Sequence, residues 1–134
     1  MIIGLLNTGE DIVIKLVYCI AKRDDVDFAD FYRIWLDEHG PLVKSLASDL
    51  HAVKYVQSHT ILPEVNKMFK GGRDGLGEPF EGITEMWWKS EEDLNKALQT
   101  PEGRRAAAKL VDDESRITDF AKSRVFMTEE HPIF

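Results

Sequence analysis

In the segment from 12 to 22, apolar residues occur at both the odd-numbered and the even-numbered positions. The segment ends at the turn-forming residues 23 to 25. One face of a strand here would carry Ile14, Leu16, Tyr18 and Ile20, and the other would carry Val13, Val17, Cys19 and Ala21. Successive side chains of a strand point to opposite sides of the sheet, so neither face of this strand is suited to water. The pattern predicts a central strand that is covered on both sides.

The next segment has the spacing of a helix. Behind a candidate N-cap at Asp27, apolar side chains recur three and four residues apart at Phe28, Phe31, Tyr32, Trp35 and Leu36. Gly40-Pro41 then interrupts the pattern, because proline has no amide donor and suits the first turn of a helix. A second, kinked helical segment is expected from 42 to 50, with His39 at the break.

Alternation with a period of two returns from 51 to 62 and predicts a second strand, on which Tyr55, Gln57 and His59 share one face. Residues 63 to 79 follow without clear periodicity and include glycines at 71, 72, 75 and 77. The stretch 64–79 is therefore predicted to be a glycine-rich loop, such as a lid or a binding loop.

Two further strands are expected at 83–89 and 123–128, and two helices should begin behind the capping residues Ser90 and Thr100. The order strand, helix, strand, strand, helix, strand predicts an α+β fold, the ferredoxin-like split βαβ arrangement with an antiparallel four-stranded sheet. A length of 134 residues suits a single domain over 1–134, with 1–11 as an N-terminal arm.

The predicted sheet has two apolar faces, but its helices cover one. The third and fourth strands are expected to place Trp87 with Val125 on one side and Met86, Trp88 and Phe126 on the other. An apolar face of this size needs a cover, and a second copy of the same sheet is the simplest one. The chain is therefore predicted to be a homodimer with a shared apolar interior, a dimeric α+β barrel.

Charge and cysteine content narrow the choice of partners. With 17 basic and 24 acidic side chains the net charge is −7, which argues against a nucleic-acid partner. The single cysteine cannot form an internal disulfide and fits a reducing compartment. Because no segment has the length of a membrane span or the basic start of a signal peptide, a cytoplasmic protein with no membrane partner is expected.

Histidines are the candidates for acid–base chemistry near neutral pH. On one strand His51 and His59 would lie about 26 Å apart, at roughly 3.3 Å per residue, which is too far to share a metal ion. One cysteine gives no thiolate cluster, and the glycine-rich segment lacks the Gly-Lys-Ser/Thr ending of a phosphate loop. No metal site is predicted.

Each candidate residue has a purely structural interpretation as well as a functional one. The row Tyr55, Gln57 and His59 either faces an apolar cavity or lies on an edge strand facing water. His39 is either a general acid at a helix end or a partner of the helix carbonyls. Glu85 either has a pKa raised by burial or pairs with an arginine such as Arg124.

The segment 31–43, Phe-Tyr-Arg-Ile-Trp-Leu-Asp-Glu-His-Gly-Pro-Leu-Val, resembles the signature of the EthD family, named for ethyl tert-butyl ether degradation. Blocks at 55–59, 80–88, 113–116 and 123–131 resemble later parts of the family in the right order, so the resemblance covers about 13–134. It implies a dimeric α+β barrel. Similar fungal proteins are dehydratases or decarboxylases of aromatic polyketides, and the wider superfamily includes cofactor-free monooxygenases, cyclases, muconolactone isomerases and haem enzymes.

The leading hypothesis is a cofactor-independent lyase, dehydratase or isomerase that binds a small hydrophobic carbonyl or aromatic compound. Its predicted catalytic residues are His39, Tyr55 and His59. Its predicted substrate-binding residues are Tyr18, Gln57, Glu85, Trp87, Trp88 and Phe126. The alternatives are a non-catalytic accessory protein that binds a small molecule in a degradation pathway, and a haem-binding or cofactor-free oxidoreductase.

Overall fold

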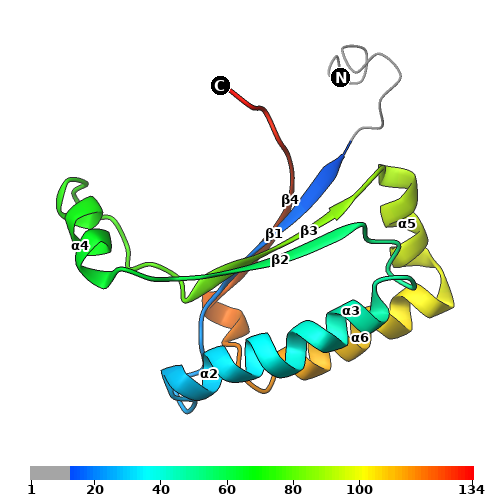
Figure 1. The fold of residues 1–134 in the computed structure, drawn as a ribbon, viewed down its shortest axis with the longest axis horizontal. Helices are drawn as coiled ribbons and strands as arrows, with labels where there is room; N and C mark the ends of the chain where they lie inside the picture. The colour runs from blue at the N-terminus through cyan, green and yellow to red at the C-terminus, as the bar shows by residue number, and fades with distance from the viewer. Residues whose placement is uncertain (1–12) are drawn as a thin grey trace.

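The computed structural model describes residues 13–134, so the predicted arm at 1–11 lies outside the described residues. Four antiparallel strands form one sheet in the order β2-β3-β1-β4 (Figure 1). The strands are β1 (Ile14–Ile20), β2 (Lys54–His59), β3 (Gly82–Trp88) and β4 (Arg124–Glu129). This topology confirms the predicted ferredoxin-like α+β fold, with a sheet that is not closed within one chain.

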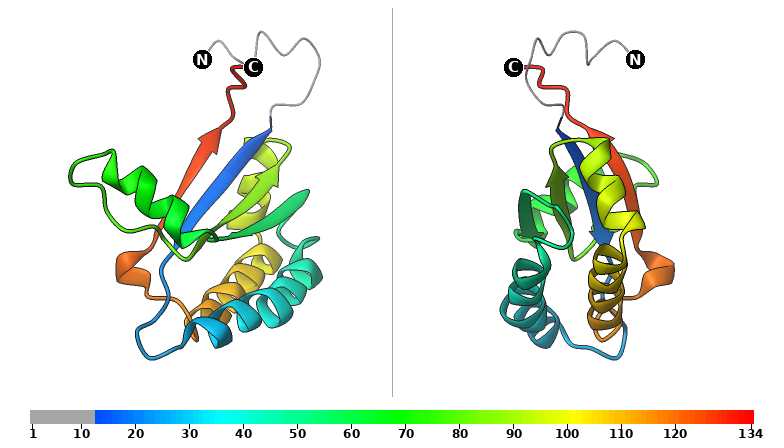
Figure 2. Two further views of the ribbon diagram at one scale, coloured as in Figure 1. Left: turned by 60° about the vertical axis from the view of Figure 1, so that its left-hand side comes forward. Right: turned by 90° about the vertical axis from the view of Figure 1, so that its right-hand side faces the viewer.

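Two helical connections cover one face of the sheet. The first consists of α2 (Phe28–Ile34), η1 (Trp35–His39) and α3 (Gly40–Leu46), and the second of α5 (Glu91–Gln99) and α6 (Pro101–Glu114). Figures 1 and 2 show α2 and α3 running beside α6 below the strands. The predicted caps are confirmed, since the side chains of Asp27, Ser90 and Thr100 each accept a backbone N–H of the first helical turn.

The core between sheet and helices has two parts. Near α3 and α6 it is built from Val43, Leu46, Leu50, Met86, Trp88 and Ala106. Near α2 it is built from Ile20, Phe31, Trp35 and Ile117. Phe31 and Trp35 therefore anchor the first helical connection, whereas aliphatic side chains pack with Trp88 and Met86 in the other part of the core.

The sequence predicted a break in the helix at Gly40-Pro41. In the structure the helix continues through this point and only widens. Residues 35–39 form a π-helical turn, η1, in which the Gly40 N–H bonds to the Trp35 carbonyl, and helical backbone continues through His39 into α3. Pro41 explains the widening, because it cannot donate to the carbonyl four residues earlier and its ring clashes with that carbonyl. His39 is thus inside a continuous helix, buried and turned toward the sheet.

The predicted loop at 64–79 is wrong over its first half. Residues 63–71 form a helix, α4 (Pro63–Gly71), which contains no buried residue, and η2 (Phe120–Lys122) is a short 3-10 turn before β4. Figure 1 shows α4 beyond the end of β2 and β3, away from the other helices. Its apolar side chains Val65, Met68 and Phe69 are exposed, so tertiary packing gives this helix little support.

The predicted pairing of faces on β3 and β4 is also wrong. Both strands pair with β1, where Val17 lies opposite Glu85 on one side and opposite Phe126 on the other. Directly opposed residues share a face, so Phe126 lies with Glu85 and Trp87, while Val125 lies with Met86 on the side of the helices. The predicted central position of β1 is confirmed, because β1 lies between β3 and β4 in the sheet.

Candidate functional site

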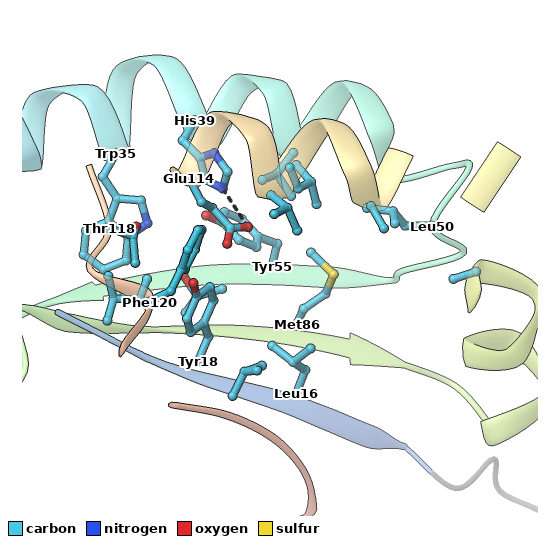
Figure 3. Close-up of a pocket in the computed structure, with 18 of the residues that line it drawn as sticks. Leu16, Tyr18, Trp35, His39, Leu50, Tyr55, Met86, Glu114, Thr118 and Phe120 are labelled. Atoms are coloured by element: carbon cyan, nitrogen blue, oxygen red, sulfur yellow. Dashed lines mark ion pairs between the residues drawn. The ribbon is translucent and has the colours of Figure 1, made fainter. Parts of the chain in front are cut away.

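A largely apolar cavity of about 430 Å³ lies between the sheet and the helices (Figure 3). Its walls come from β1, β2, β3, η1, α3, α5 and α6, with side chains such as Leu16, Met86, Trp88, Leu94 and Leu110. A volume of this size suits a small organic ligand. The rim is formed by side chains that line the cavity and are also exposed, namely Leu98, Val111, Phe120 and Val125. The cavity therefore opens to the surface between the α5–α6 pair and β4.

His39 projects from the π-helical turn into this cavity and is held from behind by a carboxylate. Its Nδ1 lies 2.7 Å from Asp113 Oδ2, and its Nε2 lies 3.9 Å from Glu114 Oε2. The first distance is a hydrogen bond, in which Nδ1–H donates to the carboxylate, whereas the second is too long for one. Within residues 13–134, Nε2 has no hydrogen-bond partner and so presents its lone pair to the cavity.

The carboxylate that orients His39 is ionised. Burial would raise the pKa of Asp113, but hydrogen bonds from His39 and Arg116 outweigh it and hold that pKa below its usual range. Arg116 Nη2 lies 2.7 Å from Asp113 Oδ1, and its Nη1 lies 3.0 Å from Glu38 Oε1. Asp113 therefore has a cation on one side and the imidazole on the other, which fixes the tautomer of His39.

The second carboxyl of the cavity has the opposite character. Burial raises the pKa of Glu114, hydrogen bonding from Tyr18 partly offsets this rise, and the negative charge of Asp113 adds to it, so that the pKa is about 7. The same contact and burial raise the pKa of Tyr18. The two neighbouring carboxyls thus differ near neutral pH. Asp113 is an anion, whereas Glu114 is partly protonated and can take up or release a proton.

Tyr55 lies below His39 in the cavity, and its hydroxyl contacts an amide (Figure 3). Gln57 Nε2 donates to Tyr55 Oη over 2.9 Å and to the Trp35 carbonyl over 2.8 Å. Gln57 Oε1 lies 2.9 Å from His59 Nε2, and the His59 ring stacks on Trp35 with 4.3 Å between centroids. Burial lowers the pKa of His59, which favours a neutral ring.

The structure brings together some of the predicted site residues. The cavity is lined by Tyr18, His39, Tyr55 and Trp88. Gln57 and His59 lie on the same face of β2, outside the cavity but joined to Tyr55 by hydrogen bonds. The row is therefore neither in a dimer interior nor on a solvent-facing strand face, because the helices of the same chain cover it.

Glu85, Trp87 and Phe126 do not line this cavity, because their register on β3 and β4 places them on the opposite face of the sheet. Glu85 Oε2 pairs with Lys15 Nζ over 2.7 Å. Its suggested partner Arg124 lies on β4, which is not a neighbour of β3 in the sheet. Trp87 has the ammonium group of Lys54 4.7 Å from its ring centroid.

Sequence reasoning missed Asp113 and Glu114 as site residues. Both lie at the end of α6, far from His39 in the sequence. Their pattern is typical of an ordinary charged helix end. The signal that could have found them is the family-like block at 113–116, which pairs a carboxylate with Arg116. Local patterns cannot show that this helix end lies against η1.

Comparison with known protein families matches residues 23–121 to the EthD domain. The chain belongs to the EthD family. The matched region contains His39, Tyr55, Asp113 and Glu114, so these four residues of the site lie within the family domain, whereas Tyr18 precedes the matched region. A comparison with curated proteins finds no match.

Solved structures share the fold. An EthD family protein from Bacillus halodurans C-125 is 18% identical, with a TM-score of 0.58 over 89% of this chain and 99% of that one. A dimeric ferredoxin-like protein of unknown function from Bacteroides fragilis is 13% identical, with a TM-score of 0.56 over 88% and 96% of the chains. A variant of SnoaB, a cofactor-independent oxygenase from Streptomyces nogalater, is 11% identical, with a TM-score of 0.52 over 90% and 92%. At these identities the likeness shows the fold alone.

Two further structural findings concern residues 13–134. No helix in this part of the chain is long and apolar enough to cross a membrane. Nor does it bring three His, Cys, Asp or Glu side chains together in an arrangement that could hold a metal ion.

Proposed function

We propose that the protein binds a small, neutral, apolar carbonyl compound in the cavity and moves a proton on it, with His39 as the base. The observation that carries this proposal is the orientation of His39, whose Nδ1–H is bonded to the Asp113 carboxylate. Its Nε2 faces the largely apolar cavity, 3.9 Å from Glu114, and has no hydrogen-bond partner among residues 13–134. An imidazole held in this way is a competent general base, because its basic nitrogen is fixed in one direction.

The charge of the cavity favours a neutral ligand. Among the described residues that line it, none is Lys or Arg, and Glu114 contributes negative charge when it ionises. A ligand carboxylate would lose its hydration there without gaining a cation, which is costly. The apolar walls instead suit a ring or a hydrocarbon chain.

The proposed step is enolisation. His39 Nε2 takes a proton from the carbon next to the ligand carbonyl, the electrons of the broken C–H bond form a C=C bond, and the carbonyl becomes an enolate. Return of a proton from His39 to the same or another carbon completes exchange or isomerisation. Glu114, which lies 3.9 Å from Nε2 and has a pKa of about 7, is the second group that can hold a proton in this step.

We also propose that the open face of the sheet is covered by a second copy of the chain. That face carries Val17 and Phe126, which lie opposite each other on β1 and β4, and Phe126 is 51% exposed. A similar structure from Bacteroides fragilis is described as dimeric. A homodimer would bury this apolar face and leave the cavity on the other side of each sheet.

Enolisation is tested with 2-tetralone, a neutral bicyclic ketone, by following exchange of its C1 protons in D2O with NMR. We expect the wild-type protein to accelerate exchange and His39→Gln to lose 10²- to 10⁴-fold of that acceleration, the usual order for a positioned base. His131→Gln is the matched control, because His131 is exposed and contacts Glu129.

Asp113→Asn should also slow exchange, because an amide in place of the carboxylate no longer fixes the His39 tautomer. Binding of 2-tetralone with no acceleration of exchange would favour the non-catalytic binding protein instead. Equal exchange in wild-type protein and His39→Gln would refute the role of His39.

A further inference from the structure

The direction of each hydrogen bond behind Tyr55 can be deduced from groups that can only accept. The Trp35 carbonyl is an acceptor, so the Gln57 atom 2.8 Å from it must be the amide nitrogen. That nitrogen has a second hydrogen, which points to Tyr55 Oη at 2.9 Å. The amide oxygen is then the atom 2.9 Å from His59 Nε2, and this histidine nitrogen must carry the hydrogen.

These assignments leave Tyr55 with one role. Its oxygen accepts a hydrogen bond from Gln57, and the neighbouring Thr84 hydroxyl lowers the Tyr55 pKa in the same sense, as a donor does. Within residues 13–134 no carbonyl or carboxylate receives the Tyr55 proton. Burial raises the pKa of Tyr55, and the donors Gln57, Thr84 and the Trp35 indole partly offset that rise. The Trp35 N–H is buried and has no full hydrogen bond to any of the described residues. With donors gathered behind the oxygen, the hydroxyl proton is free to point into the cavity that Tyr55 lines.

The surroundings hold this arrangement in place. Trp35 is 1% exposed, and its ring stacks on His59 and contacts Phe31. The amide of Gln57 is engaged at both ends, so it cannot turn over without losing its bonds to Trp35 and His59. Because this network keeps the Tyr55 hydroxyl in one direction, the hydroxyl favours ligands with a hydrogen-bond acceptor at that point, in addition to the selection by shape.

We propose that His59 and Gln57 act as positioning residues that fix Tyr55 as a hydrogen-bond donor into the cavity, so that the ligand must present an oxygen acceptor such as a ketone carbonyl. This inference rests on the proposed function, because it concerns the ligand of the same cavity. It adds the group that selects this ligand: through the Tyr55 hydroxyl, a neutral carbonyl compound is bound in preference to a hydrocarbon of the same shape.

The test compares 2-tetralone with tetralin, which has the same two rings without the carbonyl. We expect wild-type protein to bind the ketone about three- to tenfold more tightly, the usual range for one neutral hydrogen bond. Tyr55→Phe should reduce that ratio to near one while leaving the affinity for tetralin unchanged. In infrared spectra, the carbonyl stretch of bound, ¹³C-labelled ketone should lie at lower frequency in wild-type protein than in Tyr55→Phe.

The role of Gln57 is tested with Gln57→Glu, which keeps the size of the side chain but can accept the Tyr55 proton. We expect this variant to lose the preference for the ketone and the shift of the carbonyl stretch, as Tyr55→Phe does. Gln99→Glu, at an exposed position of α5, is the matched control and should behave as wild type. If Gln57→Glu does not fold, the comparison between wild type and Tyr55→Phe still decides the donor role of Tyr55.

Equal affinity for both compounds in wild-type protein, with an unshifted carbonyl stretch, would overturn this inference and leave His39 chemistry untouched. Tight binding of the ketone through Tyr55 without proton exchange would overturn the proposed reaction and leave this inference standing. Failure of both compounds to bind would contradict the proposed cavity function, and the inference with it.

Discussion

Glu114 shows most clearly how position changes the chemistry of one residue. It is next to Asp113 in the chain, yet burial raises its pKa to about 7 while Asp113 stays ionised beside Arg116. The difference arises because Arg116 and His39 donate to Asp113, whereas Glu114 faces the apolar cavity and has Tyr18 as its hydrogen-bond donor. Two adjacent carboxyls can therefore have separate acid and orienting roles.

This raised pKa predicts a specific pH dependence of stability. Folded protein holds the Glu114 proton up to about pH 7, whereas the unfolded chain releases it near 4.5, so the free energy of unfolding falls as pH rises between those values. The loss attributable to Glu114 is at most about 3 kcal/mol. Urea unfolding at pH 5 and pH 8 should show that Glu114→Gln removes this part of the dependence. The exposed-site variant Glu102→Gln should retain it, and an unchanged slope in Glu114→Gln would contradict the assignment.

At the residue scale, the sequence identified His39 and Tyr55 but not the groups that give them their chemistry. A histidine beside Gly-Pro on a helical stripe is visible in the sequence, and so is a polar row on a strand. The contact between His39 and Asp113 joins residues 74 positions apart and depends on how α6 lies against η1. Such a contact follows from tertiary packing and leaves no local pattern.

At the scale of elements, the π-helical turn sets the direction of two side chains of the site. Trp35 begins this turn and His39 ends it, so the widened backbone positions both toward the sheet. The turn requires a close approach to β3, where Gly82 has no side chain. A Cβ at this position would lie 2.7 Å from Trp35 Cη2 and would also clash with the Ser58 carbonyl oxygen.

Gly82→Ala is therefore expected to destabilise the fold by about 1 to 3 kcal/mol, because the added methyl group has no room. Thermal or urea unfolding would measure the change. Gly77→Ala is the matched control, since a Cβ there meets nothing within 4 Å. If both variants unfolded at the same denaturant concentration as wild type, the packing of Trp35 against β3 would be looser than described.

The errors at this scale have identifiable causes. The sequence does not predict α4, because the helical spacing of Val65, Met68 and Phe69 is short and runs directly into the glycines at 71 to 77. The wrong grouping of Phe126 with Met86 arose because β3 and β4 are each in register with β1, and that register cannot be deduced from either strand alone. Order and type of the main strands and helices were predictable, because their hydrophobic periods are long and regular.

At the scale of the whole molecule, one chain has a covered face with a cavity and an open face with apolar residues. We expect light scattering at micromolar concentration to give twice the chain mass of 15.3 kDa. Phe126→Lys should shift the protein toward monomer, because Phe126 lies at the centre of β4 on the open face. Phe28→Lys, at the exposed start of α2, should leave the mass unchanged. A monomeric wild-type protein would exclude this dimer.

The arrangement of the whole molecule also limits how a proton can be exchanged. His39 approaches a bound ligand from the side of the helices, and the sheet closes the other side. A base fixed on one side removes one of the two protons of a ligand methylene, whereas a base in solution reaches both.

The most direct test of the account is therefore the number of deuterium atoms that the protein places at C1 of 2-tetralone in D2O, measured by mass spectrometry after correction for exchange in buffer. With wild-type protein and the His131→Gln control, we expect rapid exchange that stops at one deuterium per molecule. With His39→Gln, this exchange should be lost. Exchange of both C1 protons at equal rates, or the same rate with His39→Gln, would contradict the account.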